Sequence, residues 1–141
     1  MNGADFIAEF LREKSIKNIF TVTGGACAFI IDAIAKCKNL NYICFQHEQA
    51  AAMAADAVWR IQKTPGVTVV TSGPGATNLI TGIACSYFDS IPSIHITGQV
   101  NLNESAKLNN LDVRQIGFQE TNIVEIVKPI TKYSVKIENM D

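Results

Sequence analysis

Short runs of consecutive apolar residues alternate along this chain with longer segments in which apolar residues recur every three or four positions. The short runs are typical of strands buried on both faces, and the longer segments are typical of helices. Strands are predicted at 18–22, 42–45, 67–71, 93–97 and 131–137. Helices are predicted after a capping Asn2, around 29–34, at 48–62, at 76–87 and near 121–127. This alternation predicts an α/β fold, with a parallel sheet flanked by helices on both faces.

Length and composition indicate one globular domain, at residues 1–141. The 141 residues are 48% apolar and 18% charged, and the net charge of -1 includes no run of like charges, which argues against nucleic-acid binding. No apolar stretch is long enough to span a membrane, and the amino-terminal segment lacks the pattern of a signal peptide. The 4 cysteines form no C-x-x-C pair. We therefore expect reduced cysteines, a cytoplasmic location and no metal ligands on this chain.

Three glycine-containing or polar segments directly follow predicted strands. Thr23-Gly24-Gly25 follows the first strand, His47-Glu48 follows the second, and 71–78 (TSGPGATN) follows the third. Because ligands of parallel sheets bind beyond the carboxyl ends of the strands, these segments predict a binding site at that edge.

The segment TSGPGATN lies between a predicted strand and a predicted helix. Its two glycines allow a ligand to approach the backbone, and the helix that follows offers free N–H groups. The chain contains neither G-x-x-x-x-G-K-[ST] nor G-x-G-x-x-G, so a tight turn without a ligand is an equally good interpretation.

Glu48 is predicted in the first turn of a helix, where the helix dipole favours a carboxylate. Taken alone, it is better interpreted as a simple helix-start residue. The helix behind it is rich in small side chains, which predicts that another element packs close by and partly buries Glu48. These alanines are Ala50, Ala51, Ala52, Ala54, Ala55 and Ala57. His47 is either a base or, as we favour, a hydrogen-bonding residue at a strand end, and His95 is expected in the core.

Several segments resemble a known family in their order and spacing. They are FQHEQAAAMAADA at 45–57, the segment 65–100 that contains TSGPGATN, DSIP and ITGQV, and GFQETNIVEIVKPITKY at 117–133. They resemble the amino-terminal domain of the acetolactate synthase large subunit and, more broadly, the pyruvate oxidase-like thiamine diphosphate enzymes. Glu48 matches the family's glutamate, which hydrogen-bonds the aminopyrimidine ring so that it takes the proton from the thiazolium carbon. That carbon then attacks a 2-oxo acid.

The resemblance also implies roles for residues near the predicted site. Phe118 and Gln119 match positions on the substrate side. Loop positions that line the pyrimidine pocket are matched by Thr23, Gly24, Gly25, Thr71, Pro74 and Asn78. Two departures are that the family commonly has proline where Thr23 stands, and that residues 99–118 form a longer stretch than acetolactate synthases usually show.

The sequence contains no motif of the family's other domains. There is no GDG motif, which with later asparagines holds the magnesium and the diphosphate, and no middle domain, which binds FAD in some members. The resemblance thus implies an inactive pyrimidine-binding domain of a longer enzyme. Its partner would be the diphosphate domain of a neighbouring subunit, within a homodimer or tetramer. Two alternatives are a pyrimidine-half subunit of a two-chain 2-oxo-acid decarboxylase and a non-catalytic interaction module on the same fold.

Overall fold

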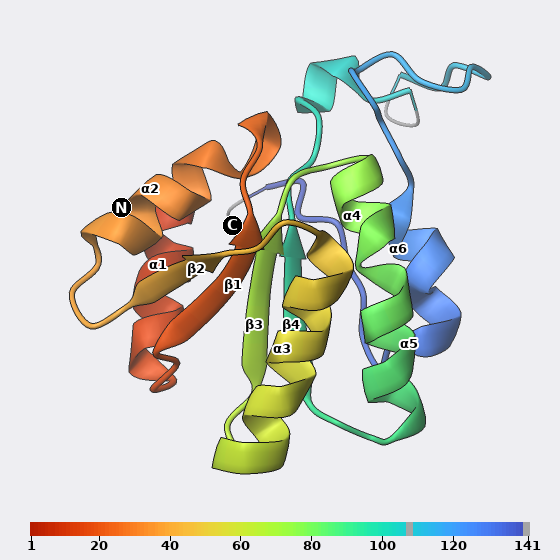
Figure 1. Ribbon diagram of the computed structural model, residues 1–141. Helices are drawn as coiled ribbons and strands as arrows, with labels where there is room; N and C mark the ends of the chain where they lie inside the picture. The colour runs from red at the N-terminus through yellow and green to blue at the C-terminus, as the bar shows by residue number, and fades with distance from the viewer. Residues whose placement is uncertain (107–108, 140–141) are drawn as a thin grey trace.

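Four parallel strands form the sheet in the described part of the chain. The structure is a computed structural model that describes residues 1–106 and 109–139. The strands are β1 (Asn18–Val22), β2 (Asn41–Cys44), β3 (Gly66–Val70) and β4 (Ser93–Thr97), arranged in the order β2-β1-β3-β4 (Figure 1). All three neighbouring pairs are parallel. The predicted parallel α/β fold is confirmed.

Helices cover both faces of this sheet. The helices α1 (Gly3–Glu13) and α2 (Ala28–Lys36) lie on one side, and α3 (Glu48–Gln62) and α5 (Ile80–Phe88) lie on the other (Figure 1). The short helices α4 (Pro74–Asn78) and α6 (Ile123–Val127) adjoin α5. Three single 3₁₀ turns complete the described elements: η1 (Gly25–Cys27), η2 (Leu102–Glu104) and η3 (Lys128–Ile130).

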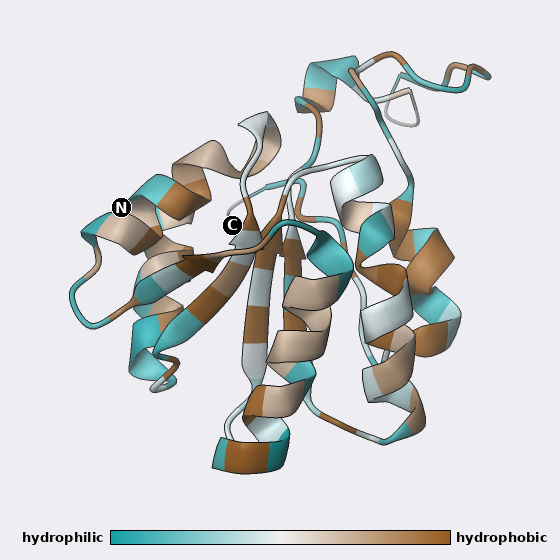
Figure 2. Ribbon diagram, in the orientation of Figure 1, coloured by the Kyte–Doolittle hydropathy of each residue, from teal (hydrophilic) through white to brown (hydrophobic). Residues whose placement is uncertain are grey.

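Successive residues of the central strands point to opposite faces, as strand geometry requires. Ile19, Val67 and Val69 are fully buried and pack with Leu11 of α1 and Ile34 of α2. The other face forms two clusters with α3, one around Phe20 and one around Val70. The brown strands in Figure 2 show this apolar centre between the helix layers.

Small residues let α3 approach its neighbours closely. A Cβ atom placed on Gly82 of α5 would lie 2.4 Å from Cβ of Ala52, and one placed on Gly66 would lie 2.0 Å from the carbonyl oxygen of Ala55. These distances are far below van der Waals contact, so a glycine is needed opposite each alanine. The prediction that another element packs closely on this helix is confirmed.

The predicted strand at 131–137 is wrong. Residues 131–139 form no strand in the structure, although Gln99 Nε2 donates a hydrogen bond to the Ile137 carbonyl oxygen at 2.9 Å. Instead of pairing with the edge strand β4, residues 131–135 lie across a groove of about 1090 Å³ from it. The apolar side chains that suggested a strand are largely exposed, with Tyr133 at 79%. An alternation of apolar residues predicts a strand only where a neighbouring strand is available for backbone hydrogen bonds.

Two further expectations need correction. The residues of β2 are all exposed, so this edge strand is not covered on both faces. The helix predicted at 76–87 is divided at Leu79, where α4 ends and α5 begins. In the part of the chain that the structure describes, no helix is both long and apolar enough to cross a membrane.

Candidate functional site

Glu48 lies at the amino-terminal end of α3 with its side chain packed inside the protein. His47 caps the helix, because its Nδ1 accepts a hydrogen bond from the Gln49 backbone N–H at 3.2 Å. The cap fixes where the helix starts and directs Glu48 inward, where 8% of its surface is exposed. His47 itself is exposed and serves as the hydrogen-bonding residue favoured from the sequence.

Asn78 orients the Glu48 carboxylate. It is the last residue of α4, and its Nδ2 donates a hydrogen bond to Glu48 Oε2 at 2.9 Å. The two residues are 30 positions apart in sequence and meet because α4 and α3 pack beside each other at the carboxyl edge of the sheet. Asn78 thereby leaves Oε1 as the oxygen that faces the glycine turn.

Gly24, in the loop after β1, and Gly75, in the first turn of α4, lie against Thr71 next to this carboxylate. A Cβ atom on Gly75 would lie 2.6 Å from Thr71 Cγ2 and 3.2 Å from Glu48 Oε1. A Cβ atom on Gly24 would lie 2.6 Å from Thr71 Cβ. The loops after β1 and β3 therefore meet at Thr71, and glycine at position 75 gives Oε1 room that any larger residue would fill.

Gln119 reaches the same turn from the far end of the chain. Gly73 has a φ of +60°, a left-handed conformation that favours glycine. A Cβ atom there would also lie 2.7 Å from both Cβ and the carbonyl oxygen of Gln119. The neighbouring Phe118 is 82% exposed. The structure thus brings Gln119 against the TSGPG turn, with Phe118 projecting from the same segment.

The remaining predicted residues border the site without such contacts. Thr23 and Pro74 are exposed, and a Cβ atom on Gly25 would meet no atom within 4 Å. Each of the three is next in sequence to Gly24 or Gly75. Their predicted contacts with a cofactor stay predictions.

Sequence reasoning missed two residues that the structure places in this region. Gly75, which makes room for Glu48 Oε1, was visible as the second glycine of the GPG turn. Glu120 organises the segment next to Gln119, and its sequence signal was its place in the family-like run GFQE at 117–120. In the described ranges, no group of three or more histidine, cysteine or acidic side chains could hold a metal ion.

His95 lies away from Glu48, within β4. Its Nδ1 is 2.8 Å from Thr68 Oγ1 and its Nε2 is 2.9 Å from Ser93 Oγ. Burial lowers the pKa of His95 to about 4, so the ring is neutral at pH 7. His95 lines the large groove beside β4, whereas Glu48, Thr71 and Asn78 do not line it. The groove is therefore separate from the site around Glu48. His95 is partly buried and lines this groove, so it lies at the margin of the core and not within it as predicted.

A parallel α/β domain with a buried carboxylate at the carboxyl ends of its strands belongs to the class of ligand-binding α/β domains. The family described as "Thiamine pyrophosphate enzyme, N-terminal TPP binding domain" matches residues 1–126, and the chain belongs to this family. The resemblance stated from the motifs is confirmed.

The chain is homologous to acetolactate synthase large subunits. It is 40% identical over 141 residues to the acetolactate synthase large subunit of Buchnera aphidicola subsp. Acyrthosiphon pisum, covering 100% of this chain and 23% of that protein. It is 38% identical over 141 residues to the acetolactate synthase isozyme 3 large subunit of Escherichia coli (strain K12), with the same coverage. The chloroplastic acetolactate synthase of Arabidopsis thaliana is 36% identical over an alignment of 142 positions, which covers 99% of this chain and 20% of that protein. The chain spans less than a quarter of these relatives.

Proposed function

We propose that this chain is the pyrimidine-binding domain of a thiamine diphosphate-dependent enzyme that acts on 2-oxo acids, with acetolactate synthase-like carboligation after decarboxylation. The observation that supports the proposal most directly is the Glu48 carboxylate, which is buried, held by Asn78 and placed next to Gly75. The family and its acetolactate synthase relatives supply the cofactor class.

The residues present fit an aminopyrimidine. Such a ring needs one carboxyl group at a ring nitrogen and a close surface against which it can lie. Glu48 Oε1 supplies the carboxyl oxygen, and Asn78 holds the other oxygen of the same group. Gly24 and Gly75 let the backbone pack tightly around Thr71 beside it, because a Cβ atom at either glycine would collide with the Thr71 side chain.

Glu48 would hold and move one proton at Oε1. Asn78 donates to Oε2, so it fixes the plane of the carboxylate and leaves Oε1 for the ligand. Thiamine diphosphate, once bound, would supply a carbon nucleophile for the carbonyl group of a 2-oxo acid. The protein would contribute a positioned carboxylate and water exclusion.

The rest of the site belongs, in this proposal, to another domain. A diphosphate needs cationic groups, and its magnesium needs a cluster of metal-binding side chains. In the described part of this chain, no group of three or more histidine, cysteine or acidic side chains could hold a metal ion. We propose that a diphosphate domain of a neighbouring subunit supplies them, in a dimer or tetramer, with FAD as an option for a middle domain. Exposed apolar residues on α3 and α5, such as Met53, Ile61 and Phe88, support a covered face there. Four free cysteines support a cytoplasmic location.

A chimera tests the catalytic proposal. Residues 1–141 would replace the matching segment of the Escherichia coli isozyme 3 large subunit, and acetolactate formation from pyruvate would be measured. Glu48→Gln should lower turnover by about a hundredfold or more, since a general acid–base group contributes about 10²–10⁴. Exchange of the thiazolium C2 proton should slow in parallel. Glu125→Gln, an exposed change of the same type on α6, should leave both rates unchanged.

A second measurement uses the 141-residue chain itself. An aminopyrimidine fragment of thiamine, titrated to about 10 mM, should shift the backbone amide NMR signals of Glu48, Gly75 and Asn78, because millimolar binding needs only about 4 kcal/mol. Glu48→Gln should abolish these shifts. Absence of shifts, or identical shifts in the variant, would contradict the proposal, as would an unchanged C2 exchange rate in the chimera.

A further inference from the structure

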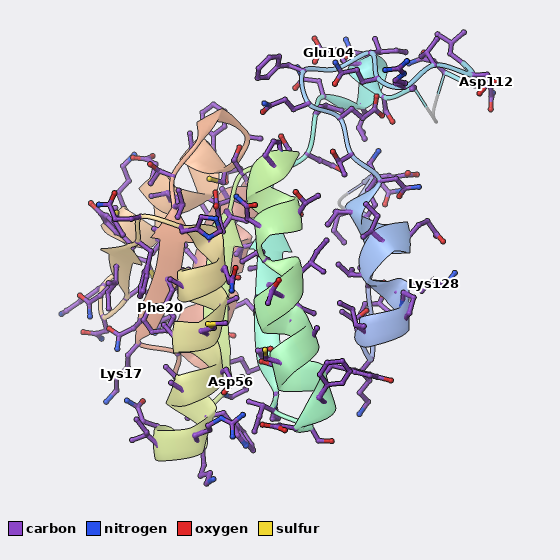
Figure 3. The ribbon with its side chains drawn as sticks, turned by 45° about the vertical axis from the view of Figure 1, so that its right-hand side comes forward. Lys17, Phe20, Asp56, Glu104, Asp112 and Lys128 are labelled. Carbon is purple, nitrogen blue, oxygen red and sulfur yellow. The ribbon has the colours of Figure 1, made fainter. Side chains whose placement is uncertain are left out.

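Residues 101–106 and 109–120, called the projecting segment below, carry Phe118 and Gln119 and lie beyond the carboxyl ends of the strands. Figure 3 shows Glu104 and Asp112 on this projecting part, at the opposite end of the molecule from Lys17. Its described residues form one 3₁₀ turn, η2, and most of their side chains are exposed. Ser105 and Ala106 are exceptions, since 0% and 7% of their surfaces are exposed. Something other than helix, strand or an apolar core must hold this segment in place.

The Glu120 carboxylate is the hydrogen-bonding centre of this segment. It accepts from Ser105 Oγ at 2.9 Å and from the Ala106 N–H at 2.9 and 3.0 Å, one distance to each oxygen. It also accepts from the Ile116 N–H at 3.1 Å. One carboxylate therefore joins residues 105–106, at the beginning of the segment, to residue 116, near its end.

The charge of Glu120 strengthens these contacts. Burial raises the pKa of the Glu120 carboxyl, but the hydrogen bonds from Ala106, Ile116 and Ser105, together with the positive charge of Lys136, outweigh it and bring the pKa below its ordinary value. Lys136 comes from the carboxyl-terminal segment, and its Nζ donates to Ser105 Oγ at 3.3 Å. Hydrogen bonds to an ionised acceptor are about twice as strong as neutral ones.

Glu120 directly follows the residue that contacts the glycine turn. Gln119, with a φ of 56°, has its backbone against Gly73. On the other side, Gly117 packs on Val100, and its N–H donates to the Glu104 carbonyl oxygen at 2.8 Å. Gly117 and Glu120, on the two sides of Gln119, therefore hold on to earlier residues of the projecting segment. Gln119 itself lies against the glycine turn beside Glu48.

We propose that Glu120 is a positioning residue, whose carboxylate closes the projecting segment and thereby sets where Phe118 and Gln119 stand relative to the Gly73–Gly75 turn. The significance of these two residues for substrate rests on the proposed function. The fixation of the segment does not, because it depends only on contacts within this chain.

An NMR titration of the 141-residue chain without any cofactor tests the fixation. In the unmodified chain, the amide signals of Ala106 and Ile116 should move together as the pH falls, with one midpoint below the ordinary glutamate value of about 4.3. This measurement needs no substitution, so it stays decisive even if a variant folds poorly.

Two variants extend the test. At pH about 7, Glu120→Gln should speed hydrogen exchange of the Ala106 and Ile116 amides by about tenfold or more, since two charge-assisted bonds are lost. It should also shift the Gly73 amide signal. Glu104→Gln, on the same segment, is the matched control, because the Glu104 side chain is exposed and accepts only from Asn101 Nδ2 among the described residues. It should change neither quantity.

The outcomes separate the two proposals. Amides that do not titrate together, or equal exchange in Glu120→Gln and Glu104→Gln, would overturn the role of Glu120. A normal titration with no binding of the aminopyrimidine fragment would instead leave Glu120 as the clamp of the segment and remove the proposed function. An unchanged Gly73 signal in Glu120→Gln would show that the segment is closed without controlling the turn, which also overturns the positioning role.

Discussion

The close packing of α3 on α5 can be tested by moving one methyl group between them. In Gly82→Ala, the new Cβ atom would lie 2.4 Å from Cβ of Ala52, about 1.0 Å closer than the 3.4 Å at which ordinary contact begins. Overpacking of this kind costs about 1–3 kcal/mol, and replacing a helical glycine by alanine returns about 0.5–1 kcal/mol. We therefore expect Gly82→Ala to lower the free energy of unfolding by about 1–2 kcal/mol.

The compensating variant is Ala52→Gly, which removes the methyl group on the other helix. Alone it should be destabilising, because glycine in a helix costs about 1 kcal/mol relative to alanine. Combined with Gly82→Ala, it should recover about 1–2 kcal/mol as a favourable coupling energy, since the two methyl groups no longer collide.

Urea unfolding followed by circular dichroism would measure all four proteins of the cycle. Ala57→Gly, at an exposed position of α3, gives the cost of the same exchange without a packing contact. Two results would refute the reasoning: a loss below about 0.5 kcal/mol for Gly82→Ala, or effects that add to within about 0.5 kcal/mol in the double variant.

Three further predictions concern pH, cofactor and assembly. His95 stays neutral in the folded chain down to a pKa of about 4, while the unfolded chain binds a proton below about 6.5, so stability should fall between these values by roughly 1–3 kcal/mol. Urea unfolding across pH should show this loss, and His95→Gln but not His47→Gln should remove it. By calorimetry with magnesium present, the 141-residue chain should bind thiamine diphosphate only weakly, and a micromolar dissociation constant would show that the diphosphate needs no other domain. In sedimentation velocity the chain should self-associate, and a strict monomer up to about 100 μM would mean that the faces of α3 and α5 need no cover.

Local sequence patterns were sufficient for the strands β1 to β4 and for the helix capped by Asn2. The Asp5 N–H donates to Asn2 Oδ1 at 2.9 Å, as a side chain at that position does in any chain. Alternating layers followed from the same patterns, because the continuously apolar central strands β1 and β3 need cover on both faces. The motif FQHEQ also indicated Glu48, through resemblance to a family.

The same patterns failed where a partner decides the outcome. Residues 131–137 have the composition of a strand, yet their backbone finds no strand to pair with in the described structure. The exposure of β2 is likewise a property of its edge position and cannot be read from its apolar residues. Strand propensity reflects the surroundings of a residue as much as the residue itself.

The amino-acid sequence by itself determined the parallel α/β layers, the glycine turns at the strand ends and the family. Only the tertiary structure decided that Asn78 holds Glu48, that Gly75 makes room for its second oxygen, and that Glu120 ties residue 106 to residue 116. The physical reason is the sequence separation of the residues that interact. Helix and strand patterns depend on neighbours a few residues away, whereas a hydrogen bond across 30 positions exists only once α3 and α4 have packed together.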